Sequence, residues 1–259
     1  MGAQVKHVET VKQYLDEVTI RGDEAIFRGQ PVDKPLLPKV FRNYEEPYQK
    51  DLELRLFHKF RRKAAAYVDF RWKSDLDCLS VAQHYGLPTR LLDWTSKPLP
   101  ALWFAVSIDP ETPELQPVVW IVKVHKQDIV PCDSGRNDKK ARTRTAHDKP
   151  FDVKRTWVVF PDHIDGRIAS QDGCFTLHPD RNCFRDGLPT AFESNKRYGV
   201  SKGNMKKIMI SASHVGRLRK ELNDLGVNEA KLFPDTIGLC RHLAWDHKRV
   251  TERQRDQEK

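Results

Sequence analysis

Long apolar runs and paired cysteines are both missing from this 259-residue sequence. No apolar stretch approaches the roughly 18–20 residues that span a bilayer, and residues 1–10 contain no apolar core of a signal peptide. The five cysteines are scattered without a C-x-x-C pair, which disfavours a disulfide framework and a structural zinc site. We therefore expect a soluble cytoplasmic protein with reduced thiols, no membrane partner and no metal site.

The sequence patterns of several enzyme classes are absent as well. The chain has no G-x-x-x-x-G-K-[ST], no G-x-G-x-x-G after a strand, no H-E-x-x-H and no G-x-S-x-G. These absences disfavour P-loop phosphate transfer, Rossmann dinucleotide binding and the common zinc and serine hydrolases. Two clusters of His and Asp, at 162–165 and 242–247, have spacings that fit a turn and separate helix faces better than a metal site.

Acidic residues are too few to balance the basic ones, and three stretches hold the excess. The chain has 45 Lys and Arg against 36 Asp and Glu, a formal net charge of +9. Lys196 to Lys220 contains eight basic residues and no acidic one, Lys123 to Arg155 ten against five, and Lys34 to Lys73 eleven against five. Solvated surface is the simplest interpretation of any one stretch. Three together favour a polyanionic partner such as nucleic acid.

Hydrophobic periodicity predicts mostly helices in the first half of the chain and strands in the second. The predicted helices lie at about 8–18, 52–67, 76–85 and 98–106, with short strands at 24–28 and 91–95. Strands then follow at 117–124, 157–160, 168–177 and 206–210, before a last amphipathic helix from about 215 to 225, capped by Ser213. Since helices and strands do not alternate regularly, the predicted fold class is α+β. We expect one domain over residues 1–245 and a frayed, charged tail over residues 246–259.

Two polar clusters stand inside apolar surroundings. The first is Phe27-Arg28-Gly29-Gln30, at the end of a predicted strand. Its arginine either pairs with a structural carboxylate or holds an anion, because the planar guanidinium matches carboxylate and phosphate. The second runs from Gln83 to Ser96, between two predicted helices. It is either a polar pocket or a local network in which Arg90 pairs with Asp93 while Thr95 and Ser96 cap the next helix.

These clusters carry a resemblance to a known family. In chain order, the residues that carry it are Phe27-Arg28-Gly29, the segment from Gln83 to Ser96 with Pro98, Ala101 and Phe104-Ala105, Gln171-x-Gly173-x-Phe175, and Leu232-Phe233-Pro234-Asp235. Together they resemble the FRG domain family, which is named for its Phe-Arg-Gly motif, over most of the chain. The sequence departs from the family at Thr236-Ile237-Gly238, where an acidic-Gly pair is more usual, and in its own loop over residues 132–156.

A more distant similarity is to ADP-ribosyltransferases, and it implies a split β-sheet core with flanking helices that binds NAD as substrate. By this resemblance Arg28 and Gly29 would hold the NAD phosphates, and Thr95 and Ser96 would line the nicotinamide pocket. The resemblance also implies that His84 or Tyr85 would position NAD or stack on it. Arg90 and Asp93 would make further contacts to the nucleotide, and Gln171 would orient its ribose. The reacting groups would be Arg28, His84 and Gln171, with no metal.

Gln171 stands where those enzymes carry a glutamate. An amide can orient a ribose hydroxyl but supplies no negative charge to an oxocarbenium-like transition state. The acid would then be Asp172, Asp93 or Glu193, and His84 would take the acceptor's proton.

Two functional hypotheses follow. The first is an NAD-dependent ADP-ribosyltransferase toxin that modifies nucleic acid, RNA more readily than DNA. It would belong to a toxin–antitoxin or anti-phage system and have a neutralising antitoxin partner. The alternative is a non-catalytic nucleic-acid or nucleotide-binding module, in which aromatics interleaved with the basic residues stack on bases, namely Tyr67, Phe70, Trp72, Trp94 and Trp157. Most of these aromatics fall on core spacing, which also fits packing.

Overall fold

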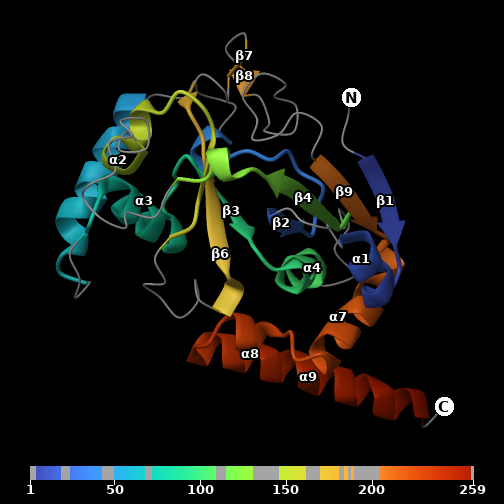
Figure 1. The fold of residues 1–259 in the computed structure, drawn as a ribbon. Helices are drawn as coiled ribbons and strands as arrows, with labels where there is room; N and C mark the ends of the chain where they lie inside the picture. The colour runs from blue at the N-terminus through green and yellow to red at the C-terminus, as the bar shows by residue number, and fades with distance from the viewer. Residues whose placement is uncertain are drawn as a thin grey trace.

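A computed structural model describes residues 4–18, 24–42, 50–67, 72–108, 115–130, 146–161, 170–180, 184–185, 188–189 and 205–257. It shows an α+β fold built on a seven-stranded mixed sheet with flanking helices (Figure 1). The strands of this sheet are β1 (Gln4–Val8), β2 (Glu24–Gln30), β3 (Leu91–Thr95), β4 (Val118–Val124), β5 (Trp157–Val159), β6 (Gly173–Leu177) and β9 (Met205–Ile210). A separate two-stranded sheet pairs β7 (Phe184–Arg185) with β8 (Leu188–Pro189).

The order of strands in the large sheet is β1-β9-β4-β2-β3-β6-β5. Only β1 and β9 pair in parallel, whereas the other neighbours are antiparallel. β2 pairs with β4 along its whole length, from Glu24 opposite Val124 to Gln30 opposite Val118. Between β2 and β3, by contrast, a single register pair joins Phe27 to Thr95. The two halves of the sheet therefore diverge at this junction.

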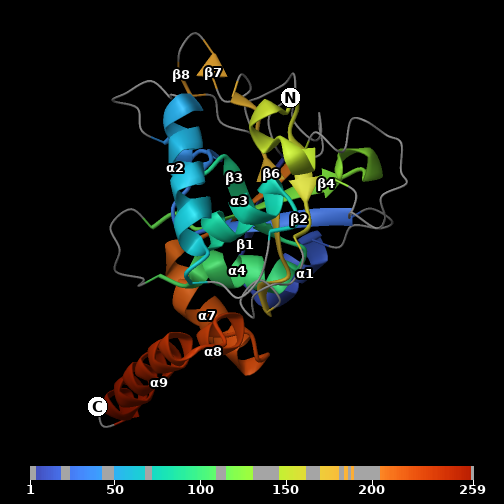
Figure 2. The ribbon, with the colours of Figure 1, turned by 90° about the vertical axis from the view of Figure 1, so that its left-hand side faces the viewer.

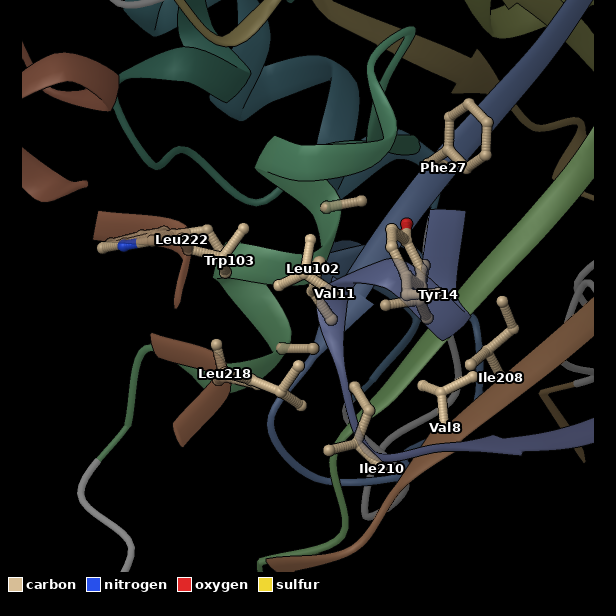
Figure 3. Packing of buried hydrophobic residues seen from close by; sticks show 14 of the residues in the cluster. Val8, Val11, Tyr14, Phe27, Leu102, Trp103, Ile208, Ile210, Leu218 and Leu222 are labelled. Carbon is tan, nitrogen blue, oxygen red and sulfur yellow. The ribbon is translucent and has the colours of Figure 1, made fainter. Parts of the chain in front are cut away.

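The helices fall into two groups that cover one face of the sheet. α1 (Val11–Val18), α4 (Pro98–Val106) and α7 (Val215–Asp224) pack on β1, β9, β4 and β2. The core between them is apolar (Figure 3), and it includes Val8, Phe27, Leu102, Ile208 and Leu218. α2 (Lys50–Ala64) and α3 (Asp75–His84) pack on β3, β6 and β5 through a second core. The junction of β2 and β3 thus lies between the two helix groups.

The remaining helices are α8 (Glu229–Leu232) and α9 (Thr236–Gln257), which extends away from the sheet (Figure 2). Short 3-10 turns lie at Lys39–Phe41, Lys126–Asp128, Pro150–Asp152 and Ala212–His214. None of the described helices is long and apolar enough to cross a membrane.

The sequence predictions hold for most of the central elements. β2, α3, β3, α4, β4, β5, β9 and α7 lie within a few residues of the predicted ranges. The helix predicted at 8–18 is confirmed as α1, which begins at Val11, but the strand formed by residues 4–8 before it was not predicted. The predicted strand over 168–177 is too long, since residues 170–171 are helical and β6 begins at Gly173. Asp172 joins the two with a positive φ of 45°.

The helices differ from the sequence predictions in several further respects. The buried side of α2 is formed by Glu53, Phe57 and Ala64, whereas Leu52 at its start is exposed. The sequence analysis also missed α8 and α9, and α9 continues as a helix across the boundary predicted at residue 245. The caps expected from Ser96 and Ser213 do not form, since α4 and α7 have no side-chain cap.

Candidate functional site

A cavity of about 360 Å³ opens at the junction of β2 and β3. Six of the residues singled out in the sequence line it, namely Arg28, Gly29, His84, Asp93, Thr95 and Gln171. They come from β2, the end of α3, β3 and the turn before β6, so the fold gathers segments that are far apart in the chain. The volume falls within the usual range for small-molecule sites.

Arg28 and Asp93 face each other across the diverging strands. The Nη1 atom of Arg28 donates a hydrogen bond of 2.6 Å to the main-chain oxygen of Asp93 and lies 3.6 Å from Oδ2 of its carboxylate. Burial lowers the pKa of the Arg28 guanidinium from its ordinary value, the carboxylate of Asp93 opposes this, and nearby Arg42 lowers it further. Arginine stays charged despite such a shift because its ordinary pKa is so high.

The guanidinium of Arg28 is only partly used by these contacts. Its Nε–H group is buried and donates no hydrogen bond to any of the described residues. A buried donor left without a partner costs free energy, and an anion bound along that edge would satisfy it. Asp93 on the other side of the cavity is about half exposed, so its carboxylate faces the same open space.

Gln83 fixes the carboxylate of Asp93, a role that the sequence analysis missed. Its Nε2 donates to both carboxylate oxygens of Asp93, at 3.0 and 3.1 Å. The Oε1 atom of the same amide accepts a bond of 2.7 Å from the hydroxyl of Thr89, and that hydroxyl accepts from the main-chain N–H of Leu91. Because Oε1 accepts, the amide must present its N–H group to Asp93. The spacing of ten residues between Gln83 and Asp93, at the end of a helix and in the next strand, is the only sequence signal for this pair.

Gly29 explains why the Phe-Arg-Gly segment ends in glycine. A Cβ atom at this position would lie 1.8 Å from the main-chain oxygen of Ala101 and 2.7 Å from the main-chain nitrogen of Ala105. The backbone of β2 therefore packs directly on the backbone of α4, which no larger residue permits. This contact between the backbones of β2 and α4 fixes the position of Arg28 and Gly29 at the cavity.

Thr95 and Gln171 tie three segments together at the rim. The hydroxyl of Thr95 donates a bond of 2.6 Å to the main-chain oxygen of Gln171 and accepts one of 3.1 Å from the N–H of Lys97. The side-chain Nε2 of Gln171 donates to the main-chain oxygen of Leu232 at 2.9 Å. This bond holds the end of α8 against the cavity, where Phe233 forms part of the wall.

The rest of the wall is aromatic. Phe27, Phe104, Phe175 and Phe233 line the cavity, and the rings of Phe104 and Phe233 meet edge to face with centroids 6.1 Å apart. Such a wall suits a planar or ribose-like group beside the polar ones. Phe104, Phe175 and Phe233 belong to the motifs quoted above, although no role was assigned to them.

Arg90 does not line the cavity, which corrects the expectation that it contacts a nucleotide. Its side chain is fully buried and forms an ion pair with Glu53, with Nη2 at 2.7 Å from Oε2. A second pair joins its Nη1 to Asp180 at 2.6 Å, and the guanidinium lies over the ring of Phe151. The predicted pair between Arg90 and Asp93 is therefore wrong, because Glu53 on α2 takes the place of Asp93.

Tyr85 and Ser96 also lie outside the cavity. Tyr85 is 65% exposed, and its ring meets that of His84 edge to face with centroids 5.1 Å apart. Ser96 is held through its main-chain N–H, which donates to the oxygen of Asp172 at 3.0 Å. Asp93 is thus the predicted carboxylate that the structure places in the cavity, while Asp172 does not line it and Glu193 lies outside the described residues.

Neither thiol nor metal chemistry is suggested by the described part of this site. Cys174 lines the cavity, but burial raises the pKa of its thiol well above the ordinary value, which keeps it protonated. Among the described residues, no group of three or more His, Cys, Asp or Glu side chains is arranged to hold a metal ion.

The basic stretch from Lys196 to Lys220 is described only from residue 205 onwards. There Lys206 pairs with Glu17, and Lys207 pairs with Asp33 and lies over the ring of Trp120. Only 15% of the Lys207 side chain is accessible, so this lysine is mostly buried between its partners. Of the basic stretch from Lys123 to Arg155, residues 131–145 lie outside the described residues.

Comparison with known proteins gives one match. Residues 23–113 match the family model of the FRG domain, which includes β2, α3, β3 and α4 and most of the cavity-forming residues. A search of curated proteins found no match, and neither did a search of solved structures. This segment, with its Phe27-Arg28-Gly29 motif, therefore matches the FRG domain over about a third of the chain.

Proposed function

We propose that the cavity binds NAD and that the protein transfers ADP-ribose from it to nucleic acid, RNA in preference to DNA. The observation that carries this proposal is the pairing of Arg28 with Asp93 in one cavity that has an aromatic wall. The open Nε edge of Arg28 suits a pyrophosphate oxygen. The divergence of β2 and β3 beside Arg28 supports the split sheet expected of an ADP-ribosyltransferase-like core.

Asp93 supplies the negative charge that Gln171 lacks. In the proposed reaction the bond between nicotinamide and ribose breaks, and its electron pair leaves with nicotinamide. The ribose carbon becomes electron-poor, and a nearby carboxylate stabilises that charge. Gln83 holds the carboxylate of Asp93 in one orientation through two hydrogen bonds, so it acts as a positioning residue.

His84 completes the reaction as proton acceptor. A hydroxyl or amine of the acceptor forms the new bond to the ribose carbon, and its proton passes to the imidazole. His84 is the last residue of α3 and lines the cavity near its exposed neighbour Tyr85, on the side from which an acceptor would approach. Modification of cellular RNA would harm the cell that makes the enzyme, so the proposal includes a neutralising antitoxin and a role in toxin–antitoxin or anti-phage defence.

One observation favours a second candidate, a non-catalytic module that binds nucleotides or nucleic acid. Gln171 stands where ADP-ribosyltransferases carry glutamate, and its amide is bonded to Leu232 as a structural link. A protein with this arrangement would bind NAD in the cavity without cleaving it.

The proposal is tested by incubating the protein with radiolabelled NAD and separate pools of RNA, DNA and cell protein. We expect free nicotinamide, and label in the RNA pool above the others. Asp93→Asn should lower the rate by about 100-fold, the size of effect seen when one charge-stabilising group is removed from an active site. Asp152→Asn is the matched control, because that carboxylate is exposed and pairs with Lys50 away from the cavity. NAD binding without release of nicotinamide would instead support the binding module.

A further inference from the structure

A second hollow, of about 390 Å³, lies beside the cavity and plays no part in the chemistry above. We call it the tyrosine groove, and it is formed by Phe60, Lys63, Ala64, Tyr67 and Tyr85. The first four belong to the end of α2 and the turn after it, while Tyr85 follows α3. Its position next to the cavity is set by His84, because the ring of His84 contacts the ring of Tyr85 and also lines the cavity.

The two tyrosines of the groove are unusually accessible for aromatic residues. Tyr67 is 87% exposed and Tyr85 is 65% exposed. Rings of this kind usually pack in a core, as Phe57 and Phe151 do against each other in the adjacent cluster. Two open rings at one hollow provide planar surfaces on which another planar group can stack.

A row of cations leads to the groove along α2. Arg55, Lys59, Arg62 and Lys63 are all exposed, and none of them forms an ion pair with another described residue. Their spacing of four, three and one places them on one side of the helix. α2 lies at the outer edge of the molecule (Figure 2), so this side faces solvent. Lys206 and Lys207, in contrast, are neutralised by Glu17 and Asp33.

We propose that α2 and the tyrosine groove form the binding track for single-stranded nucleic acid. The phosphates would follow the cations of α2, one base would stack on Tyr67 and Tyr85, and the adjoining nucleotide would reach the cavity beside His84. Open rings next to exposed cations are the combination that single strands require, because bases provide flat faces and the backbone provides charge. The inference rests on the proposed function for its nucleic-acid acceptor and places that acceptor on α2, away from the described part of the stretch from Lys196 to Lys220.

The test measures binding of a fluorescein-labelled single-stranded RNA of about 12 nucleotides by anisotropy, in the absence of NAD. Tyr67→Ala should weaken binding by about tenfold, whereas Tyr67→Phe should keep most of the affinity because the ring remains. Tyr67 is so exposed that its loss leaves the fold intact, which circular dichroism verifies. A duplex of the same length should bind more weakly than the single strand, since its bases cannot stack on the groove.

The cations are tested separately through the salt dependence of the same binding. Arg62→Gln with Lys63→Gln should flatten the slope of log affinity against log salt by about 1.4, which corresponds to two lost phosphate contacts on a single strand. Lys12→Gln is the control, since Lys12 is an exposed lysine on α1, in the other helix group.

Unchanged affinity in Tyr67→Ala would overturn the proposal. So would a salt slope that flattens in Lys12→Gln as much as in the variant of Arg62 and Lys63. So would equally tight binding of poly-glutamate, which would mark α2 as a site for acidic protein. Because NAD is absent from these binding measurements, they test the track on α2 alone. Loss of the RNA track with nicotinamide release intact would leave the proposed function standing, and RNA binding without nicotinamide release would leave the track standing.

Discussion

Gly29→Ala is expected to destabilise the protein by at least about 3 kcal/mol, a large part of the roughly 5–15 kcal/mol that keeps a typical protein folded. The new methyl group would sit 1.8 Å from the main-chain oxygen of Ala101, and neither β2 nor α4 can retreat without opening the core around Phe27. Backbone atoms cannot turn aside as a flexible side chain does, so the whole helix must shift. Urea unfolding followed by circular dichroism measures the loss.

Gly216→Ala is the matched control for this substitution. Gly216 lies in the first turn of α7, and a Cβ atom there would meet no atom within 4 Å. Alanine favours the helical state over glycine, so this variant should be as stable as the wild type or more stable by roughly 0.5–1 kcal/mol. Equal stability of the Gly29 and Gly216 variants would show that β2 and α4 are not held at the distance seen here.

Glu53→Ala is expected to cost about 3–5 kcal/mol, because it leaves the fully buried guanidinium of Arg90 without its only fully buried carboxylate partner among the described residues. Asp180 is partly exposed and cannot replace both hydrogen bonds that Glu53 accepts. The double variant Glu53→Leu with Arg90→Met should recover much of the loss, since it removes the two fully buried charges, keeps apolar volume and leaves Asp180 partly exposed to solvent.

The control for the buried pair is Asp152→Ala. Asp152 pairs with Lys50 at 2.7 Å, with both side chains well exposed to solvent, and such pairs contribute less than about 1 kcal/mol. A similar loss for Asp152→Ala and Glu53→Ala in thermal unfolding would contradict the structural role assigned to Arg90.

The sequence predicted the elements that build the cavity because their local signals agree. β4 is a continuous apolar run, and α4 has proline in its first turn and an apolar body, so pattern and propensity point to one structure. β1 was missed because Gln4–Val8 is short and half polar, and its pairing with β9 is a contact some 200 residues away. α9 was missed because its residues are mostly charged and polar, a composition that predicts an unstructured tail rather than a helix packed on a core.

The sequence predicted several residues of the candidate site but not which side chains they bond to. Arg28, Gly29 and Asp93 stand in recognisable segments, and the cavity contains all three. Which carboxylate pairs with which arginine is decided by the register of β3 and the rotation of α2. Arg90 and Asp93 are three residues apart in the chain, so alternation along an extended backbone points their side chains to opposite faces. Arg90 therefore pairs with the buried Glu53, and Asp93 pairs with Arg28. Sequence spacing carries no information on such long-range pairing.

Binding of NAD by wild-type protein and by Arg28→Gln tests the central claim most directly, with the melting temperature as the readout. Since a ligand that binds only the folded state stabilises it, NAD at about 100 times its dissociation constant should raise the wild-type melting temperature by about 5 °C or more. The Arg28→Gln variant should melt as a folded protein and show no such rise, because its amide cannot hold a phosphate along the edge that Nε provides. An unchanged wild-type melting temperature at millimolar NAD, or the same rise in both proteins, would contradict the assignment of the cavity.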